Sequence, residues 1–314
     1  MIYQENNQCF ALSIPPRIEI RGILETVMRQ DVRRFFTLFY HDIFDYPLTE
    51  EEVKFWAPGK RLKDSIVKVG RIEKKKAFFF LKGREMAIKE REKKEKLSAI
   101  KIEKAKKGTN VISLIPTVRM IGLTGALAMN NAQAASDVDL LIITRKGTLW
   151  VTRLATVAIL GLFGIPRNSG GKVERDKLCL NMWLDESDLV WNREDRNFYT
   201  AHEIAQIVPL VNKENTYERF IYLNRWIKDF WPNIVEIRNP KSDCKAGYSY
   251  RNKFKKIKYL KAVSDFVLGA SNFLAFKIQY LYMKPKITRE IVTPTRAIFH
   301  PRDWSKIVSE RLTT

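Results

Sequence analysis

The most informative stretch of the sequence is Gly122–Thr144, GLTGALAMNNAQAASDVDLLIIT. The apolar run that ends in this stretch, beginning at Val118, predicts a β-strand that enters a glycine turn. A second strand is expected over DVDLLIIT, because the run first alternates and is then continuously apolar, as in strands buried on both faces. Residues two apart on a strand point to the same face, so Asp137 and Asp139 are expected to project together.

Two carboxylates placed in this way repel each other unless divalent cations neutralise them. Their hard oxygen atoms suit Mg²⁺ or Mn²⁺. A pair of such ions can activate an attacking oxygen and stabilise a leaving pyrophosphate. The turn at Gly125 can bring backbone N–H groups, including that of Ala126, against phosphate oxygens. The alternative is that Asp137 and Asp139 are strand-end carboxylates on a solvated edge.

The order of these residues resembles the nucleotidyltransferase superfamily that includes DNA polymerase β. Leu123, Thr124, Gly125 and Ala126 are followed by ten residues and then by the Asp137–Asp139 triplet, DVD. The resemblance covers about residues 118–185. It implies a small mixed-sheet core, an NTP as substrate, Mg²⁺ or Mn²⁺ as cofactor, and transfer of NMP to an acceptor that the sequence does not identify.

The stretch departs from the family pattern at two places. Ala126 stands where the family usually has Ser or Gly, so a side-chain hydroxyl for the triphosphate is missing. The family also has a third carboxylate on a later strand, expected here over residues 177–184, where Asn181 occupies the middle. Asn181 is the expected metal ligand at that position, and Asp185 or Glu186 is the possible third carboxylate. Without one, activity is expected to be weak or lost.

Other residues near these strands have both a functional and an ordinary interpretation. Ser136, Arg145 and Lys146 are nucleotide-binding candidates, but they are also typical of a turn and of a surface. Cys179 lies on the third apolar strand and is expected in the core.

The N-terminal part predicts a winged-helix-like region and a basic linker helix over residues 1–108. A helix is expected over residues 18–41, and Thr49 and Glu52 form a capping box for a second helix. An aromatic strand ends at Gly83 after a turn rich in lysine. Lys74, Lys75 and Lys76 in this turn are the nucleic-acid-binding candidates. A long basic helix is expected at about 86–108.

The rest of the chain is expected to hold the nucleotidyltransferase core, residues 109–200, and a helical C-terminal region, residues 201–314. Within these we expect a helix over residues 149–163, mainly helix over 185–240 and a loop over 239–252. A long helix at about 254–284 and a final helix near Trp304 complete the prediction. The predicted fold class is therefore α+β.

Composition excludes several classes of protein. The chain has 314 residues, of which 45% are hydrophobic, so wholesale disorder is excluded. Three widely spaced cysteines with no C-x-x-C argue against a disulfide framework or a zinc ribbon. The N-terminus does not resemble a signal peptide, and no apolar run reaches the roughly 20 residues that span a bilayer. We therefore expect a cytoplasmic protein with no integral membrane segment.

The net charge of +21 comes from two segments. Residues 60–108 hold 19 Lys/Arg and 7 Asp/Glu, and residues 241–290 hold 12 and 3. Such segregated charge favours a polyanionic partner. The alternative function is thus a catalytically impaired protein that binds DNA or RNA through the winged helix and the basic segments. A third interpretation places the 254–284 helix on anionic lipid, although burial of Phe266, Phe273, Phe276 and Tyr280 explains its aromatic residues more simply.

Overall fold

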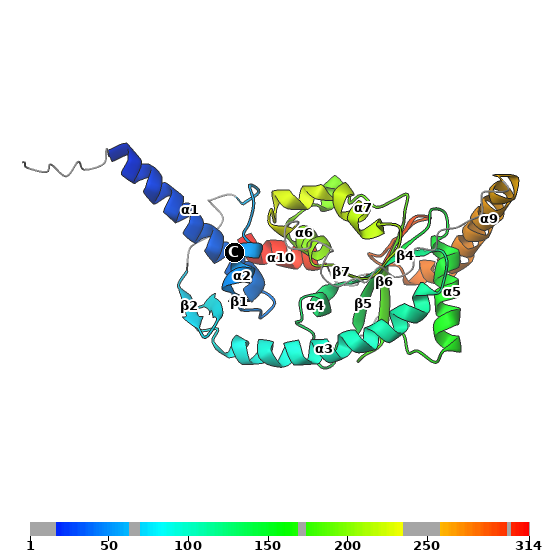
Figure 1. The fold of residues 1–314 in the computed structure, drawn as a ribbon, viewed down its shortest axis with the longest axis horizontal. Coiled ribbons are helices and arrows are strands. Elements are labelled where there is room, and N and C mark those ends of the chain that lie inside the picture. The colour runs from blue at the N-terminus through cyan, green and yellow to red at the C-terminus, as the bar shows by residue number, and fades with distance from the viewer. Residues whose placement is uncertain (1–16, 63–69, 169–173, 235–257, 300–302, 314) are drawn as a thin grey trace, which may run out of the picture.

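A six-stranded mixed sheet forms the centre of the computed structural model, which describes residues 17–62, 70–168, 174–234, 258–299 and 303–313 (Figure 1). The order of the strands is β7-β4-β5-β6-β9-β8. Strands β5 and β6 run parallel, and the other neighbouring pairs are antiparallel. The fold class is α+β, as the sequence predicts. The bounds are β4 (Val118–Leu123), β5 (Val138–Thr144), β6 (Leu178–Asp185), β7 (Val208–Asn212), β8 (Ile291–Val292) and β9 (Arg296–Ile298).

Helices cover both faces of this sheet (Figure 1). The α-helices are α1 (Arg17–Asp42), α2 (Glu50–Phe55), α3 (Met86–Ser113), α4 (Gly125–Ala128), α5 (Leu149–Leu162), α6 (Phe198–Ala205), α7 (Thr216–Leu223), α9 (Lys258–Met283) and α10 (Trp304–Thr313). The 3-10 helices are η1 (Arg193–Asp195), η2 (Arg225–Asp229) and η3 (Lys284–Lys286). Among the helices described, none has the length and apolar character needed to cross a bilayer.

Strand β5 is buried on both faces because its side chains alternate between two cores. Leu140 and Ile142 belong to the core that includes α3, α5 and α9. Leu141 and Ile143 belong to the opposite core, with residues of α1, α6 and α10. Each fully buried aliphatic side chain contributes about 1.5–3 kcal/mol. The LLII run thus fixes β5, and the aspartates before it, between two layers of helices.

The N-terminal part forms a separate three-stranded sheet in the order β1-β3-β2. These strands are β1 (Leu48–Thr49), β2 (Ile72–Lys75) and β3 (Phe78–Leu81). The expected capping box at the start of α2 is confirmed, since Thr49 and Glu52 exchange hydrogen bonds between side chain and backbone. Residues 63–69 lie outside the described part of the chain.

Helix α3 continues to Ser113, five residues beyond its expected end at Gly108. A glycine inside a helix costs about 1 kcal/mol relative to alanine, so Gly108 weakens α3 locally. In the fold, a Cβ atom at Gly108 would lie 2.4 Å from Leu178 Cδ1. The missing side chain therefore lets the helix pack closely against β6.

The prediction of a helical region over residues 201–314 is wrong in part, because β7, β8 and β9 join the central sheet. These strands hold five, two and three residues, too few for a period of two to be distinguished from a helical pattern. Pro209 is tolerated in β7 because this strand lies at the edge of the sheet. The loop expected over 239–252 lies outside the described residues.

A buried lysine connects α3 to the loop before β5. The side chain of Lys101 is only 3% exposed, and its Nζ donates to Ser136 O at 2.6 Å and to Ala134 O at 3.3 Å. The same Nζ lies 2.8 Å from Asp176 Oδ1, whose other oxygen pairs with Lys104. These bonds hold the residues that lead into Asp137.

We expect Lys101→Met to lower the free energy of unfolding by about 2–3 kcal/mol, because buried acceptors of a charged donor lose their partner. The control is Lys104→Met, which removes a 52%-exposed cation from the same carboxylate and should cost less than about 1 kcal/mol. Urea denaturation measures both. Equal losses would contradict the structural role of Lys101.

The difference in stability between the unaltered chain and Lys101→Met is expected to depend on pH. Hydrogen bonds from Lys101 and Lys104 lower the pKa of Asp176 to about 2. Its stabilising contribution is therefore present above the pKa of an unfolded aspartate, about 3.9, and is lost as the pH falls toward the folded value. The gap in stability between the unaltered chain and Lys101→Met should narrow over this window.

Candidate functional site

The turn between β4 and β5 places a glycine against an aspartate. Gly125 has a φ of +62°, a conformation that favours glycine. A Cβ atom there would lie 2.8 Å from Asp139 Oδ2. The backbone N–H of Thr124 donates to Asp139 O at 3.0 Å, which fixes the turn to β5. The carboxylate of Asp139 can therefore approach the turn only because residue 125 has no side chain.

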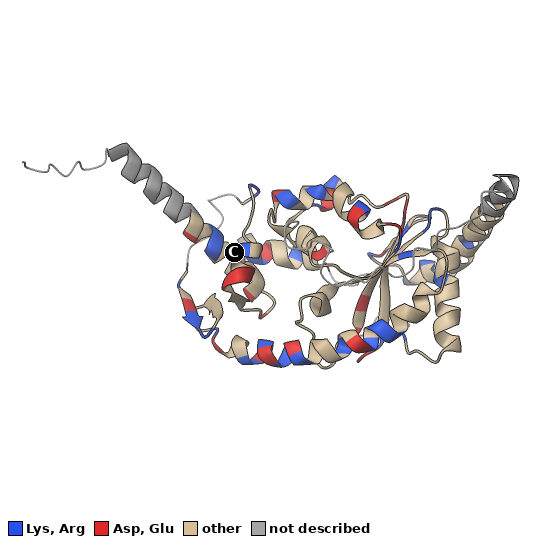
Figure 2. Ribbon diagram, viewed as in Figure 1, with Lys and Arg blue, Asp and Glu red and all other residues tan. Residues whose placement is uncertain are grey.

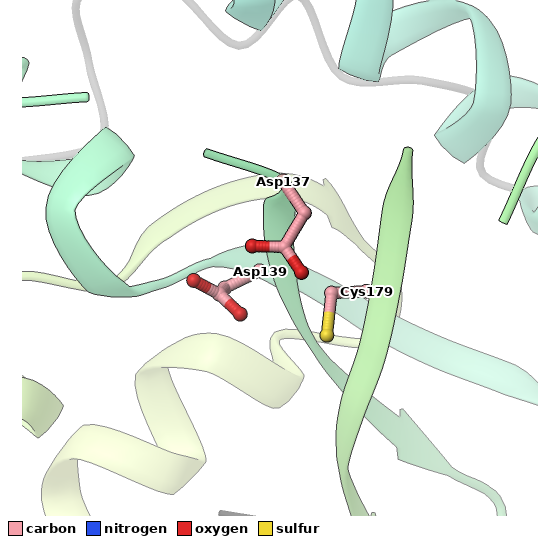
Figure 3. Close-up of side chains that lie close together, drawn as sticks. All are labelled: Asp137, Asp139 and Cys179. Atoms are coloured by element: carbon pink, nitrogen blue, oxygen red, sulfur yellow. The ribbon is translucent and has the colours of Figure 1, made fainter. Parts of the chain in front are cut away.

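Asp137, Asp139 and Cys179 converge beside this turn, as Figure 3 shows. One ligand atom of each lies within 4.8 Å of the others. Asp137 immediately precedes β5, Asp139 is the second residue of β5, and Cys179 is on the neighbouring strand β6. The two carboxylates thus project together, at the spacing that the sequence pattern predicts.

Strand β6 presents two side chains to the aspartates. Cys179 and Asn181 are two residues apart on the strand and therefore lie on one face, the side of Asp139. Asp139 pairs with Cys179, but the next pair is Leu141 with Met182, so β6 has one extra residue in this interval and Met182 takes the place opposite Leu141. Asn181 Nδ2 donates to Asp139 Oδ1 at 2.6 Å. Met182 and Leu141 still pack in one core.

The aspartates are held by neutral groups. Asn168 Nδ2 donates to Asp137 Oδ2 at 3.0 Å, and the thiol of Cys179 hydrogen bonds to both carboxylates. Among the described residues, no lysine or arginine forms an ion pair with either aspartate. Burial, followed by the charge of Asp137, raises the pKa of Asp139 to about 7. Burial and the two carboxylates also raise the pKa of Cys179.

These groups fit a divalent cation. Two carboxylates without a cationic partner leave negative charge that a metal ion would neutralise. Asn181 is only 7% exposed, and its Oδ1 has no hydrogen-bond partner among the described residues. As placed, its amide nitrogen faces Asp139, so the amide would have to turn over for Oδ1 to coordinate. Carboxylate and amide oxygens suit Mg²⁺ or Mn²⁺, and the thiol adds a softer ligand.

A cavity of about 420 Å³ lies next to the turn. Thr124 contributes to its wall, together with residues of β6, α6, β9 and α10. Glu203 of α6 faces this cavity, and its pKa is raised to about 8 by burial and by the charge of Asp139. Gln206 Nε2 donates to Glu203 Oε1 at 2.6 Å. The remaining wall is mainly apolar and aromatic, including Trp191, Tyr199, Phe220 and Trp304.

The structure does not bring the two possible third carboxylates of β6 to the site. Asp185 pairs with Thr144, at the opposite end of β5 from Asp139. It is fully buried and accepts hydrogen bonds from the backbone N–H groups of Gly147 and Ser187. Glu186 forms ion pairs with Arg119 and Arg219. Asp185 and Glu186 therefore stabilise the end of the sheet that lies away from Asp139.

Two of the expected nucleotide-binding residues also lie at that far end. Arg145 follows β5 directly, and its N–H donates to Thr117 O. At about 3.3 Å per residue, the six residues from Asp139 to Arg145 span roughly 20 Å. Lys146 is one residue further on, and its N–H donates to Glu186. We therefore remove Arg145 and Lys146 from the candidate site.

The remaining predicted residues have other contacts. Ser136 Oγ donates to Gln133 O at 2.8 Å, as in the turn interpretation. Lys75 pairs with Glu85, and Lys76 Nζ lies 2.9 Å from Glu92 Oε1. Lys74 Nζ lies 4.9 Å from the centre of the Phe79 ring.

Sequence reasoning missed three residues of this site. Cys179 was expected in the core because it lies on an apolar strand, although its spacing of two from Asn181 was a usable sign that both face the aspartates. Asn168 lies outside any motif. Glu203 lies in AHEIAQIV, where one acidic residue among apolar ones was a usable sign of a buried carboxyl group.

We expect Gly125→Ala to destabilise the fold more than Gly147→Ala. Both glycines have a positive φ, so alanine is strained at each by about 1–2 kcal/mol. A Cβ atom at Gly147 meets nothing within 4 Å, whereas at Gly125 it must displace Asp139. Chemical denaturation of both variants measures the difference. Equal losses would show that Asp139 moves aside freely.

Comparisons of the chain with protein-family models, with curated proteins and with solved structures each found no match. The contacts of the described residues are therefore the basis for any function proposed for this chain.

Proposed function

We propose that this chain is a nucleotidyltransferase that uses Mg²⁺ or Mn²⁺ to transfer NMP from an NTP to a hydroxyl or phosphate of an acceptor. One observation carries the proposal. Asp137 and Asp139 lie side by side at the start of the second strand of a strand–glycine-turn–strand unit, without a cationic partner among the described residues. The divalent cation that accompanies an NTP would supply the positive charge that this pair lacks.

Asp137 and Asp139 would hold the cation, with Cys179 or Asn181 in the position of the missing third carboxylate. The bound ion would supply charge neutralisation of the phosphates and polarisation of the reacting phosphoryl group. Because one ligand position lacks a charge, we expect weaker metal binding than in a site with three carboxylates.

The other residues of the site orient the substrates and move a proton. The turn at Gly125 leaves room for a phosphate group to approach the backbone. The cavity beside Thr124 is large enough for the body of a small molecule or for a nucleobase. Glu203 in the cavity wall is the candidate base that accepts the proton of the acceptor hydroxyl. Neutralisation of Asp139 removes one of the two causes of its raised pKa and so favours its ionised form.

Asp139→Asn is expected to abolish Mn²⁺ and Mn²⁺–ATP binding, because it removes half of the carboxylate pair. Glu194→Gln, at an exposed position of η1, is the control and should bind as the unaltered chain does. Isothermal titration calorimetry measures both. If the unaltered chain binds neither Mn²⁺ nor Mn²⁺–ATP, the proposal fails.

The affinity for Mn²⁺ measured in this titration is expected to depend on pH. Since the pKa of Asp139 is raised to about 7, binding below that pH must displace a proton. The apparent affinity for Mn²⁺ should rise by up to about tenfold per unit between roughly pH 5 and 7 and then level off. Without cation, ionisation of Asp139 should lower the stability of the fold as pH rises from about 4 to 7. Asp139→Asn should remove this slope, and an unchanged slope would contradict the assignment.

Glu203→Gln is expected to lower turnover by about 10²–10⁴-fold, the usual contribution of a general base, while NTP binding is retained. The control is Glu290→Gln, a carboxylate outside the cavity wall. Pyrophosphate release at saturating NTP and a panel of acceptors measures turnover. A variant that turns over normally would show that Glu203 is not the base.

The N-terminal arrangement supports the proposal that residues 17–81 form a winged helix. The support is the order of α1, β1, α2 and the β2–β3 hairpin, with β1 next to β3 in the sheet. Lys75 and Lys76 of this hairpin pair with glutamates of α3. Nucleic-acid binding is therefore not carried forward as a second function.

A further inference from the structure

Helix α9 exposes an apolar face. Its buried side packs on α5, where Asn272 Oδ1 accepts from Trp150 N and the Phe276 ring lies 5.2 Å from the Trp150 ring. The expectation that its aromatic residues are buried holds for Phe276 and in part for Tyr280, but it is wrong for Phe266 and Phe273. The exposed apolar side chains are Phe266 77%, Val267 56%, Phe273 58%, Leu274 61%, Ile278 58%, Leu281 70% and Tyr282 71%.

These side chains form one continuous surface, which we call the α9 face. They recur at intervals of three, four and seven residues, the spacing of neighbours on one side of a helix. The stretch from Phe266 to Tyr282 is about 25 Å long at 1.5 Å per residue. Lys277 is the one charged residue among the α9 side chains that the structure describes. Figure 2 shows this part of α9 as mostly uncharged. Monomeric soluble proteins seldom expose so long an apolar surface without a binding partner.

We propose that the α9 face binds the surface of an anionic lipid bilayer, with the helix lying in the interface. Charge identifies the partner: between Arg251 and Lys286 the sequence has nine Lys/Arg and a single acidic residue, Asp265. Six of these cations precede the α9 face and two follow it, so both ends favour anionic headgroups. Since no described helix is suited to cross a membrane, binding is peripheral.

A second copy of the chain fits this face less well. Two copies of α9 pairing through it would bring like charges together in either orientation, because both flanks are basic. An anionic bilayer instead gains from each basic residue near its surface.

The test is co-sedimentation of the full chain with phosphatidylcholine vesicles that contain about one-third phosphatidylserine. Binding is expected to these vesicles, to be much weaker to pure phosphatidylcholine, and to fall as salt is added. Neither a metal ion nor an NTP is needed, so the result is independent of the proposed nucleotidyl transfer.

The matched variants are Ile278→Ser on the α9 face and Ile100→Ser on α3. Both isoleucines are helical and 58% exposed, so each change should leave the fold intact. Ile278→Ser should weaken vesicle binding by about tenfold, the value of one buried aliphatic side chain, and Ile100→Ser should not. Adding Phe273→Ser to Ile278→Ser should weaken it further.

Three outcomes would overturn the inference. The first is no binding to the anionic vesicles at low salt, and the second is an equal effect of Ile278→Ser and Ile100→Ser. The third is an oligomer, detected by light scattering, that Ile278→Ser dissociates while vesicle binding is absent. That result would make the α9 face a subunit interface.

Discussion

The repulsion between Asp137 and Asp139 is the constraint around which the site is arranged. Two carboxylates lie close together beside a buried strand, and the described groups that contact them are neutral: Asn168, Cys179 and Asn181. Without a bound cation, the repulsion is relieved by protonation of Asp139, whose pKa is raised to about 7. A carboxyl group in that state is ready to exchange its proton for a metal ion as the pH rises. The charge of Asp139 also raises the pKa of Glu203 in the cavity wall, so metal binding and protonation of Glu203 are coupled electrostatically.

Helix α3, which packs on one face of the sheet, helps to hold Asp137 and Asp139 in position. Its two buried cations, Arg91 and Lys101, face opposite parts of the molecule. Arg91 pairs with Glu52 at the start of α2 and contacts the Tyr46 ring, while Lys101 holds the loop before Asp137. One helix thus ties the three-stranded sheet to the loop that carries the aspartates. The prediction of a basic linker helix was correct in composition, but it did not include the buried side of α3. Burial of a lysine depends on acceptors that come from distant parts of the chain, which the sequence of the helix does not show.

The sequence predicted what depends on local pattern. The capping box at Thr49, the strand–turn–strand unit and the spacing of the aspartates follow from short-range rules. The part of Cys179 in the site was missed because the apolar residues around it favoured the core, although it shares a face with Asn181. Arg145, Lys146 and Asp185 were misplaced for another reason. Arg145 and Lys146 lie close to Asp139 along the chain, and Asp185 lies close to Asn181, but an extended strand carries each to the far end of the sheet. Glu203 depends on tertiary packing of α6, which periodicity alone cannot position.

The two basic segments, similar in sequence, differ in what surrounds their charges. In the first, cations pair with acids from several elements, including Lys76 with Glu92, Arg84 with Asp42 and Lys101 with Asp176. Part of that charge is therefore used within the fold, although Lys89, Lys93 and Lys94 of α3 form no ion pair among the described residues. In the second segment, Lys277 lies over the Phe273 ring on the apolar α9 face, and Asp265 is the one acidic residue between Arg251 and Lys286. Net charge alone suggested a single polyanionic partner for both segments. The segments differ in what adjoins their charges, because the cations of the second flank an exposed apolar face that water solvates poorly.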